Sequence, residues 1–148
     1  MKHTIVLFLL SLLLLPKLCN AQTYPTPITD TASYLRYIVT NKQQFVGQPF
    51  STLYNFLQIS PKMFTPFAHI HHNRFAETNI TLAFKFAATA EDLSDTYPQL
   101  GIEWQPPYLN RQEGLALMYL YERQGIGWNG VIYNRYKNII IKDIYILQ

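Results

Sequence analysis

The spacing of apolar residues changes once along the chain, and this change constrains the fold more than any other feature. Between Tyr34 and Leu57 apolar side chains recur every three or four residues, which is the period of an amphipathic helix. From Met63 onward alternation with a period of two becomes the dominant pattern, as in strands. A chain with helices first and strands afterwards predicts an α+β domain.

Two helices are predicted ahead of the sheet. Residues 30–44 form the first, with a capping side chain at its start, and Gly47 breaks the chain after it. Residues 49–57 form the second. Pro49 suits its first turn, because the N–H group that proline lacks would have no partner there.

The strand patterns indicate four or five strands, at residues 63–72, 79–87, 100–104, 115–122 and 139–147. Pro66 indicates an edge strand or a bulge, since proline cannot donate to a neighbour. Residues 115–122 alternate like a strand buried on both faces, which we favour, although their Leu, Ala and Met also suit a helix. Residues 128–136 predict a short helix. The predicted architecture is two N-terminal helices packed on one face of a four- to five-stranded, mainly antiparallel sheet, a two-layer sandwich.

The first 21 residues have the layout of a secretory signal peptide. Lys2 precedes an apolar run over residues 5–15, and Ala21 stands at the expected cleavage site. The run is shorter than the roughly 20 residues that span a bilayer. We therefore expect an exported protein without a membrane span after cleavage. Its predicted parts are a leader (1–21), an extended segment (22–29) and a single domain (30–148).

The use of cysteine indicates the compartment in which the protein works. Cys19 is the only cysteine and lies in the leader. Bacterial lipoprotein processing requires a small residue before the lipidated cysteine, and Leu18 does not fit, so lipidation is not expected. A mature chain without cysteine excludes disulfides, cysteine nucleophiles and cysteine-bound zinc. Small secreted eukaryotic domains mostly depend on disulfides, which favours a bacterial periplasmic or secreted protein.

The charge of the mature chain is close to neutral. Lys2 and Lys17 belong to the leader, which leaves ten basic and nine acidic residues after cleavage. Nucleic-acid-binding domains carry a clustered positive surface. We therefore expect no nucleic-acid partner.

Three histidines stand close together at His69, His71 and His72. On a strand His69 and His71 project to the same face, where they could hold a metal ion with Glu77 as a third ligand. The alternative is a polar, solvent-facing edge strand, which we favour because further ligands are lacking. We therefore predict no cofactor, and keep the metal site as a low-ranked candidate.

Aromatic residues are the best candidates for a binding surface. The chain has eleven Tyr, nine Phe and two Trp. Trp104, Tyr108 and Trp128 flank predicted loops, and aromatic rings are favoured in contacts with partners. The alternative for both tryptophans is a place in the core, where large rings bury much surface.

No catalytic motif is present. None of the mature serines lies in G-x-S-x-G or S-x-x-K, and the glycines near residue 127 fit no phosphate loop. We therefore expect a small exported binding module for a protein or glycan. A metal-dependent enzyme using His69 and His71 is the first alternative. A cell-envelope structural or assembly factor is the second. The helix-pair-then-sheet layout is similar to that of small periplasmic inhibitor and assembly-factor domains, which is a likeness of architecture and does not fix function.

Overall fold

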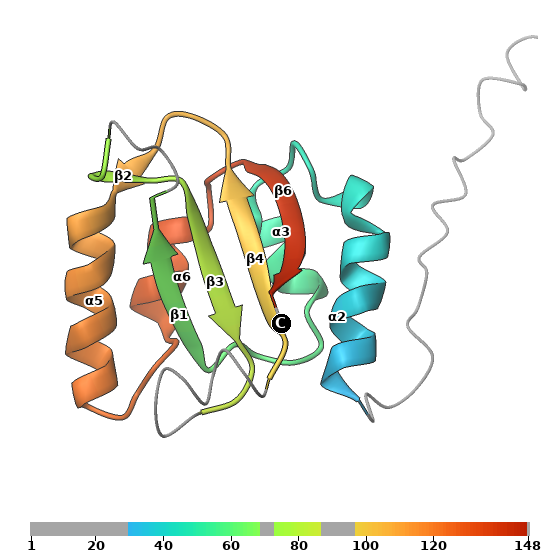
Figure 1. The fold of residues 1–148 in the computed structure, drawn as a ribbon, viewed down its shortest axis with the longest axis horizontal. Helices are drawn as coiled ribbons and strands as arrows, with labels where there is room; N and C mark the ends of the chain where they lie inside the picture. The colour runs from blue at the N-terminus through green and yellow to red at the C-terminus, as the bar shows by residue number, and fades with distance from the viewer. Residues whose placement is uncertain (1–29, 69–72, 87–96, 148) are drawn as a thin grey trace, which may run out of the picture.

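The computed structural model describes residues 30–68, 73–86 and 97–147 (Figure 1). The helical elements are α2 (Thr31–Thr40), the 3-10 turn η1 (Lys42–Gln44), α3 (Phe50–Phe56), α5 (Arg111–Arg123) and α6 (Gly130–Tyr136). The strands are β1 (Met63–Phe67), β2 (Ala76–Glu77), β3 (Asn79–Ala83), β4 (Gln99–Trp104), β5 (Leu109–Asn110) and β6 (Ile141–Leu147).

Four strands form one antiparallel sheet in the order β1-β3-β4-β6. The short strands β2 and β5 form a separate antiparallel pair. The predicted α+β fold, with helices ahead of a mainly antiparallel sheet, is confirmed. Pro66 lies in β1 at one edge of the sheet, as its missing N–H group predicts.

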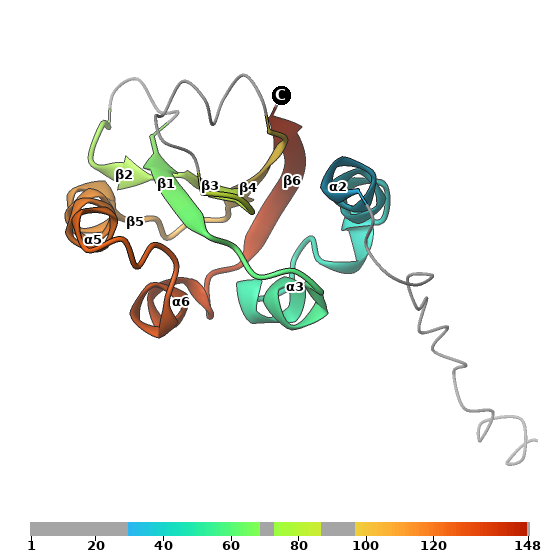
Figure 2. The same cartoon turned by 90° about the horizontal axis from the view of Figure 1, so that it is seen from below.

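The helices surround one face of the sheet. In Figure 2, α3 and α6 lie beneath the strands, while α2 and α5 stand beside the two edges of the sheet, next to β6 and β1. Contacts between elements agree with this view, since α5 packs against β1 and α2 packs against β6.

The core lies between the sheet and this helical layer. Alternate strand residues such as Ile80, Leu82, Leu100 and Ile102 are fully buried, as a period of two requires. Aromatic rings fill the space beneath them. The ring of Phe50 meets that of Trp104 edge-on, with 5.8 Å between the ring centroids. Rings of this size supply much of the buried area of a small domain.

Side-chain caps fix where α2 and α6 begin. Asp30 accepts hydrogen bonds from the backbone N–H groups of Ala32 (3.0 Å) and Ser33 (3.1 Å) at the start of α2. Asn129 accepts from Val131 N–H at 2.8 Å at the start of α6. These bonds satisfy donors that have no partner inside the helix. The predicted cap near residue 30 is confirmed.

The strand favoured at residues 115–122 is wrong, because this segment belongs to α5. Asn110 caps the helix by accepting from Gln112 N–H at 2.9 Å. Gly114 and Met118, four residues apart, form the buried side. The segment is apolar on nearly every side, so both a period of two and a period of 3.6 match it. The cap and the many good helix formers favour the helix.

The strand predicted at residues 79–87 ends earlier, at Ala83. The neighbouring strands explain the difference. Ala83 pairs with Met63 at the very start of β1, and Leu82 is the last residue of β3 that pairs with β4. Phe86, which lies inside the predicted strand range, is 58% exposed. The strand predicted at 63–72 is observed as far as Phe67, and His69, His71 and His72 lie outside the described residues.

Candidate functional site

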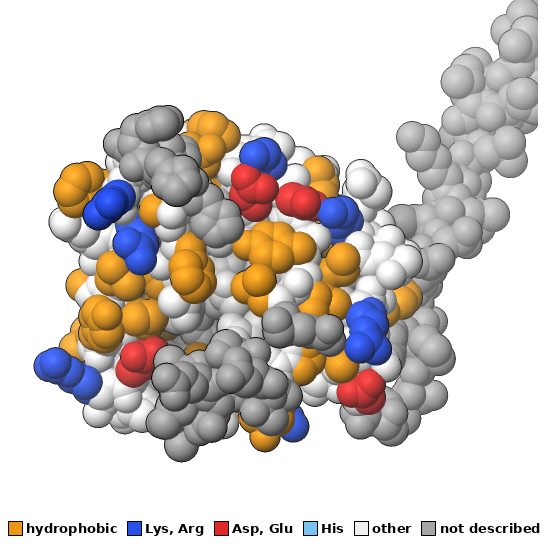
Figure 3. All heavy atoms as spheres, in the orientation of Figure 1, with side chains coloured by type: hydrophobic (Ala, Val, Ile, Leu, Met, Phe, Trp, Pro, Cys, Tyr) orange, Lys and Arg blue, Asp and Glu red, His pale blue; other side chains and the backbone are white. Residues whose placement is uncertain are grey.

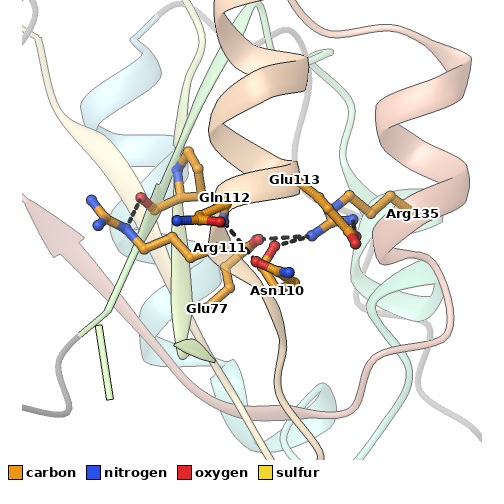
Figure 4. Close-up of polar contacts among 7 residues, drawn as sticks. Glu77, Asn110, Arg111, Gln112, Glu113 and Arg135 are labelled. Atoms are coloured by element: carbon orange, nitrogen blue, oxygen red, sulfur yellow. Dashed lines mark hydrogen bonds and ion pairs between the residues drawn. The ribbon is translucent and has the colours of Figure 1, made fainter. Parts of the chain in front are cut away.

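A buried carboxylate lies where the small β2–β5 pair meets the helices. Glu77, the last residue of β2, is 0% exposed. Arg135 of α6 reaches it, with Nη2 3.2 Å from Glu77 Oε2. The same guanidinium lies 3.0 Å from Glu113 Oε2 and donates to the carbonyl oxygen of Asn110 at 2.6 Å. Figure 4 shows these groups converging on Arg135.

A glycine makes room for the Glu77 carboxylate. Gly114 lies on the inner side of α5, where a Cβ atom would collide with Glu77 Oε2 and press on Pro66. Glycine inside a helix is unfavourable relative to alanine by about 1 kcal/mol. The position of Glu77 therefore explains why α5 carries a glycine in its second turn.

Burial dominates the electrostatics of the cluster. It raises the pKa of Glu77 above its ordinary value of 4.5, and the nearby Tyr136 hydroxyl and Arg135 guanidinium oppose this shift. Burial also raises the pKa of the Tyr136 hydroxyl, and Glu77 adds to the rise. For Arg135, burial lowers the pKa, but Glu113 and Glu77 more than compensate and hold it raised.

The arrangement fits an internal ion pair better than a reactive centre. Neither of the two surface hollows described below is lined by Glu77 or Arg135. A guanidinium beside the carboxylate also disfavours a second cation there. Within the described ranges no three His, Cys, Asp or Glu side chains are grouped to hold a metal ion. The pairing of Glu77 with His69 and His71 stays a prediction, because the histidines lie outside those ranges.

The candidate aromatic residues divide between core and surface. Trp104 is fully buried, and its ring stacks on that of Tyr136 with 5.8 Å between centroids. This position fits the core alternative, and it leaves Trp104 no exposed surface for a ligand in this structure. The sequence already indicated a core position for Trp104, because it shares its strand face with Leu100 and Ile102.

Trp128 and Tyr108 are partly buried and pack against the core. The Trp128 indole N–H donates to the Tyr54 hydroxyl at 3.4 Å, and its ring stacks on Tyr54 with centroids 6.0 Å apart. Trp128 therefore joins α3 to the start of α6 and offers little free surface. For Tyr108 only part of the ring is available to a ligand.

The outward side of α5 is the clearest exposed apolar feature among the described residues. Tyr119 is 56% exposed and Leu120 is 48% exposed. They line a shallow hollow of about 580 Å³, together with Ala116, Arg123 and Gln124. Figure 3 shows apolar side chains reaching the surface over α5. Sequence reasoning missed this surface because it treated residues 115–122 as a buried strand.

A second hollow, of about 320 Å³, lies at the start of α2. Its lining comprises Asp30, Thr31, Ala32, Phe84, Lys85, Tyr97 and Pro98. Asp30 already caps the helix and also accepts from the Ser33 hydroxyl at 2.6 Å. The Lys85 ammonium stands 4.4 Å above the Tyr97 ring centre. The charged groups of this hollow thus have partners inside the chain, which makes it the weaker candidate.

Comparison with known proteins returns no relative. No protein-family model matches the chain, and no curated protein or solved structure is significantly similar to it. Among the described residues every helix is too short or too polar to traverse a bilayer. Function is therefore inferred from the residues of the chain itself.

Proposed function

We propose that this chain is a small exported, non-catalytic module that binds a protein through the outward side of α5. We define this surface, the α5 face, as Glu113, Ala116, Tyr119, Leu120, Arg123 and Gln124. The observation that carries the proposal is the exposure of Tyr119 and Leu120 side by side over a hollow. Contiguous exposed apolar surface commonly marks a site of protein contact.

The composition of the α5 face supports a protein partner over a glycan. Tyr and Arg are enriched in protein interfaces, and an apolar centre with a polar rim is their usual arrangement. On this face Ala116 and Leu120 form the centre, while Glu113 and Arg123 lie toward the two ends. A site for a small polar ligand would place several polar groups in a deeper pocket.

A binding role also agrees with the burial of the Glu77 carboxylate. Glu77, the most deeply buried carboxylate of the candidate site, is held by Arg135 beneath α5. An available catalytic acid or base needs access to substrate. The leader supports export, because residues 1–21 combine a positive start, an apolar run and a small residue at the cleavage site.

Site-specific photo-crosslinking in the producing cell tests the proposal. A benzophenone-bearing amino acid at Tyr119 should give a covalent adduct with a protein. The matched control is the same substitution at Leu147, which is 40% exposed on β6, at the opposite end of the sheet (Figure 1). Equal adduct formation at both sites, or none at Tyr119, would refute the α5 face as the contact surface. Amino-terminal sequencing of the same protein should begin at Gln22 if the leader is cleaved.

A further inference from the structure

We infer that the partner of the α5 face is a second copy of this chain, which packs its own α5 antiparallel to the first about a two-fold axis. This inference rests on the proposed function, since it names the occupant of the same surface. It is carried by the spacing, the side-chain sizes and the charges along α5.

The spacing on the outward side is that of paired helices. Four exposed positions follow one another at intervals of three, four and three residues: Glu113, Ala116, Leu120 and Arg123. Alternating intervals of three and four residues keep a row of side chains facing a partner helix. The buried Met118 lies on the opposite side of α5, so the row points away from the core.

The row is complementary to itself when one helix is reversed. Antiparallel pairing centred near position 118 sets Ala116 of one copy against Leu120 of the other, a small side chain against a large one. It also sets Glu113 of one copy against Arg123 of the other, at both ends of the contact. Parallel pairing would instead bring Glu113 against Glu113 and Arg123 against Arg123, and like charges in an interface are unfavourable.

The charges at the ends are available for this contact. Glu113 is bound on its inner side by Arg135 through Oε2, yet its side chain remains 65% exposed. Arg123 is exposed and forms no ion pair with any residue in the described part of the chain. Each copy therefore presents a carboxylate held by Arg135 and a guanidinium that has no ion pair among the described residues. The two-fold axis brings these two groups together twice.

The size of the contact sets its strength. α5 has 13 residues, and at 1.5 Å per residue it is about 20 Å long. A single helix pair of this length falls at the small end of specific interfaces, below about 1,200 Å² in total. The dimer should therefore be weak and form in a concentration-dependent way.

Sedimentation equilibrium of the purified mature chain tests the inference. The chain should pass from monomer to dimer as its concentration rises, and Leu120→Asp should weaken association by at least about tenfold. Val131→Asp is the matched control, because Val131 is equally exposed but lies on α6 outside the α5 face. Thermal unfolding should show that both variants remain folded, since neither side chain is buried.

Cysteine crosslinking tests the antiparallel geometry. The mature chain has no cysteine of its own once residues 1–21 are removed. Mature Ala116→Cys and Leu120→Cys chains mixed under mild oxidation should form the mixed disulfide faster than either chain forms its own. Faster self-linking of each chain would overturn the antiparallel arrangement.

The outcomes separate this inference from the proposed function. A chain that stays monomeric at every concentration, while a benzophenone at Tyr119 still links it to a different protein, overturns self-association and leaves the binding surface intact. A monomer without an adduct overturns both. Dimerisation that Leu120→Asp and Val131→Asp weaken equally would place the contact elsewhere on the molecule.

Discussion

Each side of α5 departs in one respect from the usual distribution of polarity. Its inner side receives a buried carboxylate, Glu77, against Gly114, while its outer side presents Tyr119 and Leu120 to solvent. A surface helix normally buries its apolar stripe and exposes its charges. The inner side is stabilised within the chain by Arg135, whereas the outer side becomes favourable only when another molecule covers it.

Removing the cation of the buried pair should have the largest effect. Arg135→Met leaves Glu77 buried without its partner, and we expect a loss of about 3 kcal/mol in unfolding free energy, measured by urea denaturation. Lys137→Met is the control, because the Lys137 side chain bonds only the exposed Asn134 among the described residues. A second variant, Glu77→Leu with Arg135→Met, should recover much of the loss. Equal stability of Arg135→Met and the control would contradict an internal ion pair.

The two sides of α5 should respond differently to truncation. Met118→Ala removes a side chain that is 8% exposed and packed in the core, and should lower the unfolding free energy by about 2 kcal/mol. Leu120→Ala, two residues further on the outward side, should change it by no more than about 0.5 kcal/mol at concentrations where the chain is monomeric. Similar losses for both would show that the α5 face is covered within the chain.

Filling the space above Glu77 should have a smaller effect. Gly114→Ala forces the new methyl group against the carboxylate, and this clash outweighs the gain in helix propensity. We expect a net loss of about 1–2 kcal/mol by chemical denaturation. Gly130→Ala on α6 is the matched control, since nothing lies within 4 Å of the added atom. The control should be neutral or slightly stabilising, and a stabilising Gly114→Ala would show that Glu77 can move aside.

The smallest effect concerns pH. Because burial raises the pKa of Glu77 in the folded chain, folding favours its protonated form. The contribution of Glu77 to stability is therefore fully present below the ordinary value of 4.5 and is lost as the pH rises through the folded-state pKa. The difference in unfolding free energy between wild type and Glu77→Gln should shift in favour of wild type as the pH falls from 7 to 4.5. A shift in the opposite direction would mean that Arg135 outweighs burial.

Features that depend on residues close together in the chain could be predicted from the sequence, and features that depend on distant residues could not. The cap at Asp30, the edge strand with Pro66 and the two helices ahead of the sheet depend on near neighbours, and the structure confirms them. The ion pair between Glu77 and Arg135 joins positions 58 residues apart, so no local spacing announces it. The strand predicted at residues 115–122 was wrong for another reason. Apolar side chains occur on nearly every side of this segment, so both a period of two and a period of 3.6 match it. The cap at Asn110 was the signal that favours the helix.

Arg111 and the turn before α3 engage backbone groups at both edges of the sheet. At one edge the Arg111 Nε–H group donates to the carbonyl oxygen of Pro66 in β1 at 3.2 Å. At the other edge Gly47 N–H donates to the Ile141 carbonyl at 2.8 Å, and Ile141 N–H donates to Gln48 at 3.0 Å. Open edges invite pairing between chains and fibril growth. Because backbone groups on both outer strands are engaged in this way, edge-to-edge aggregation of the sheet is less favourable. Contacts with other molecules are then made mainly by side chains.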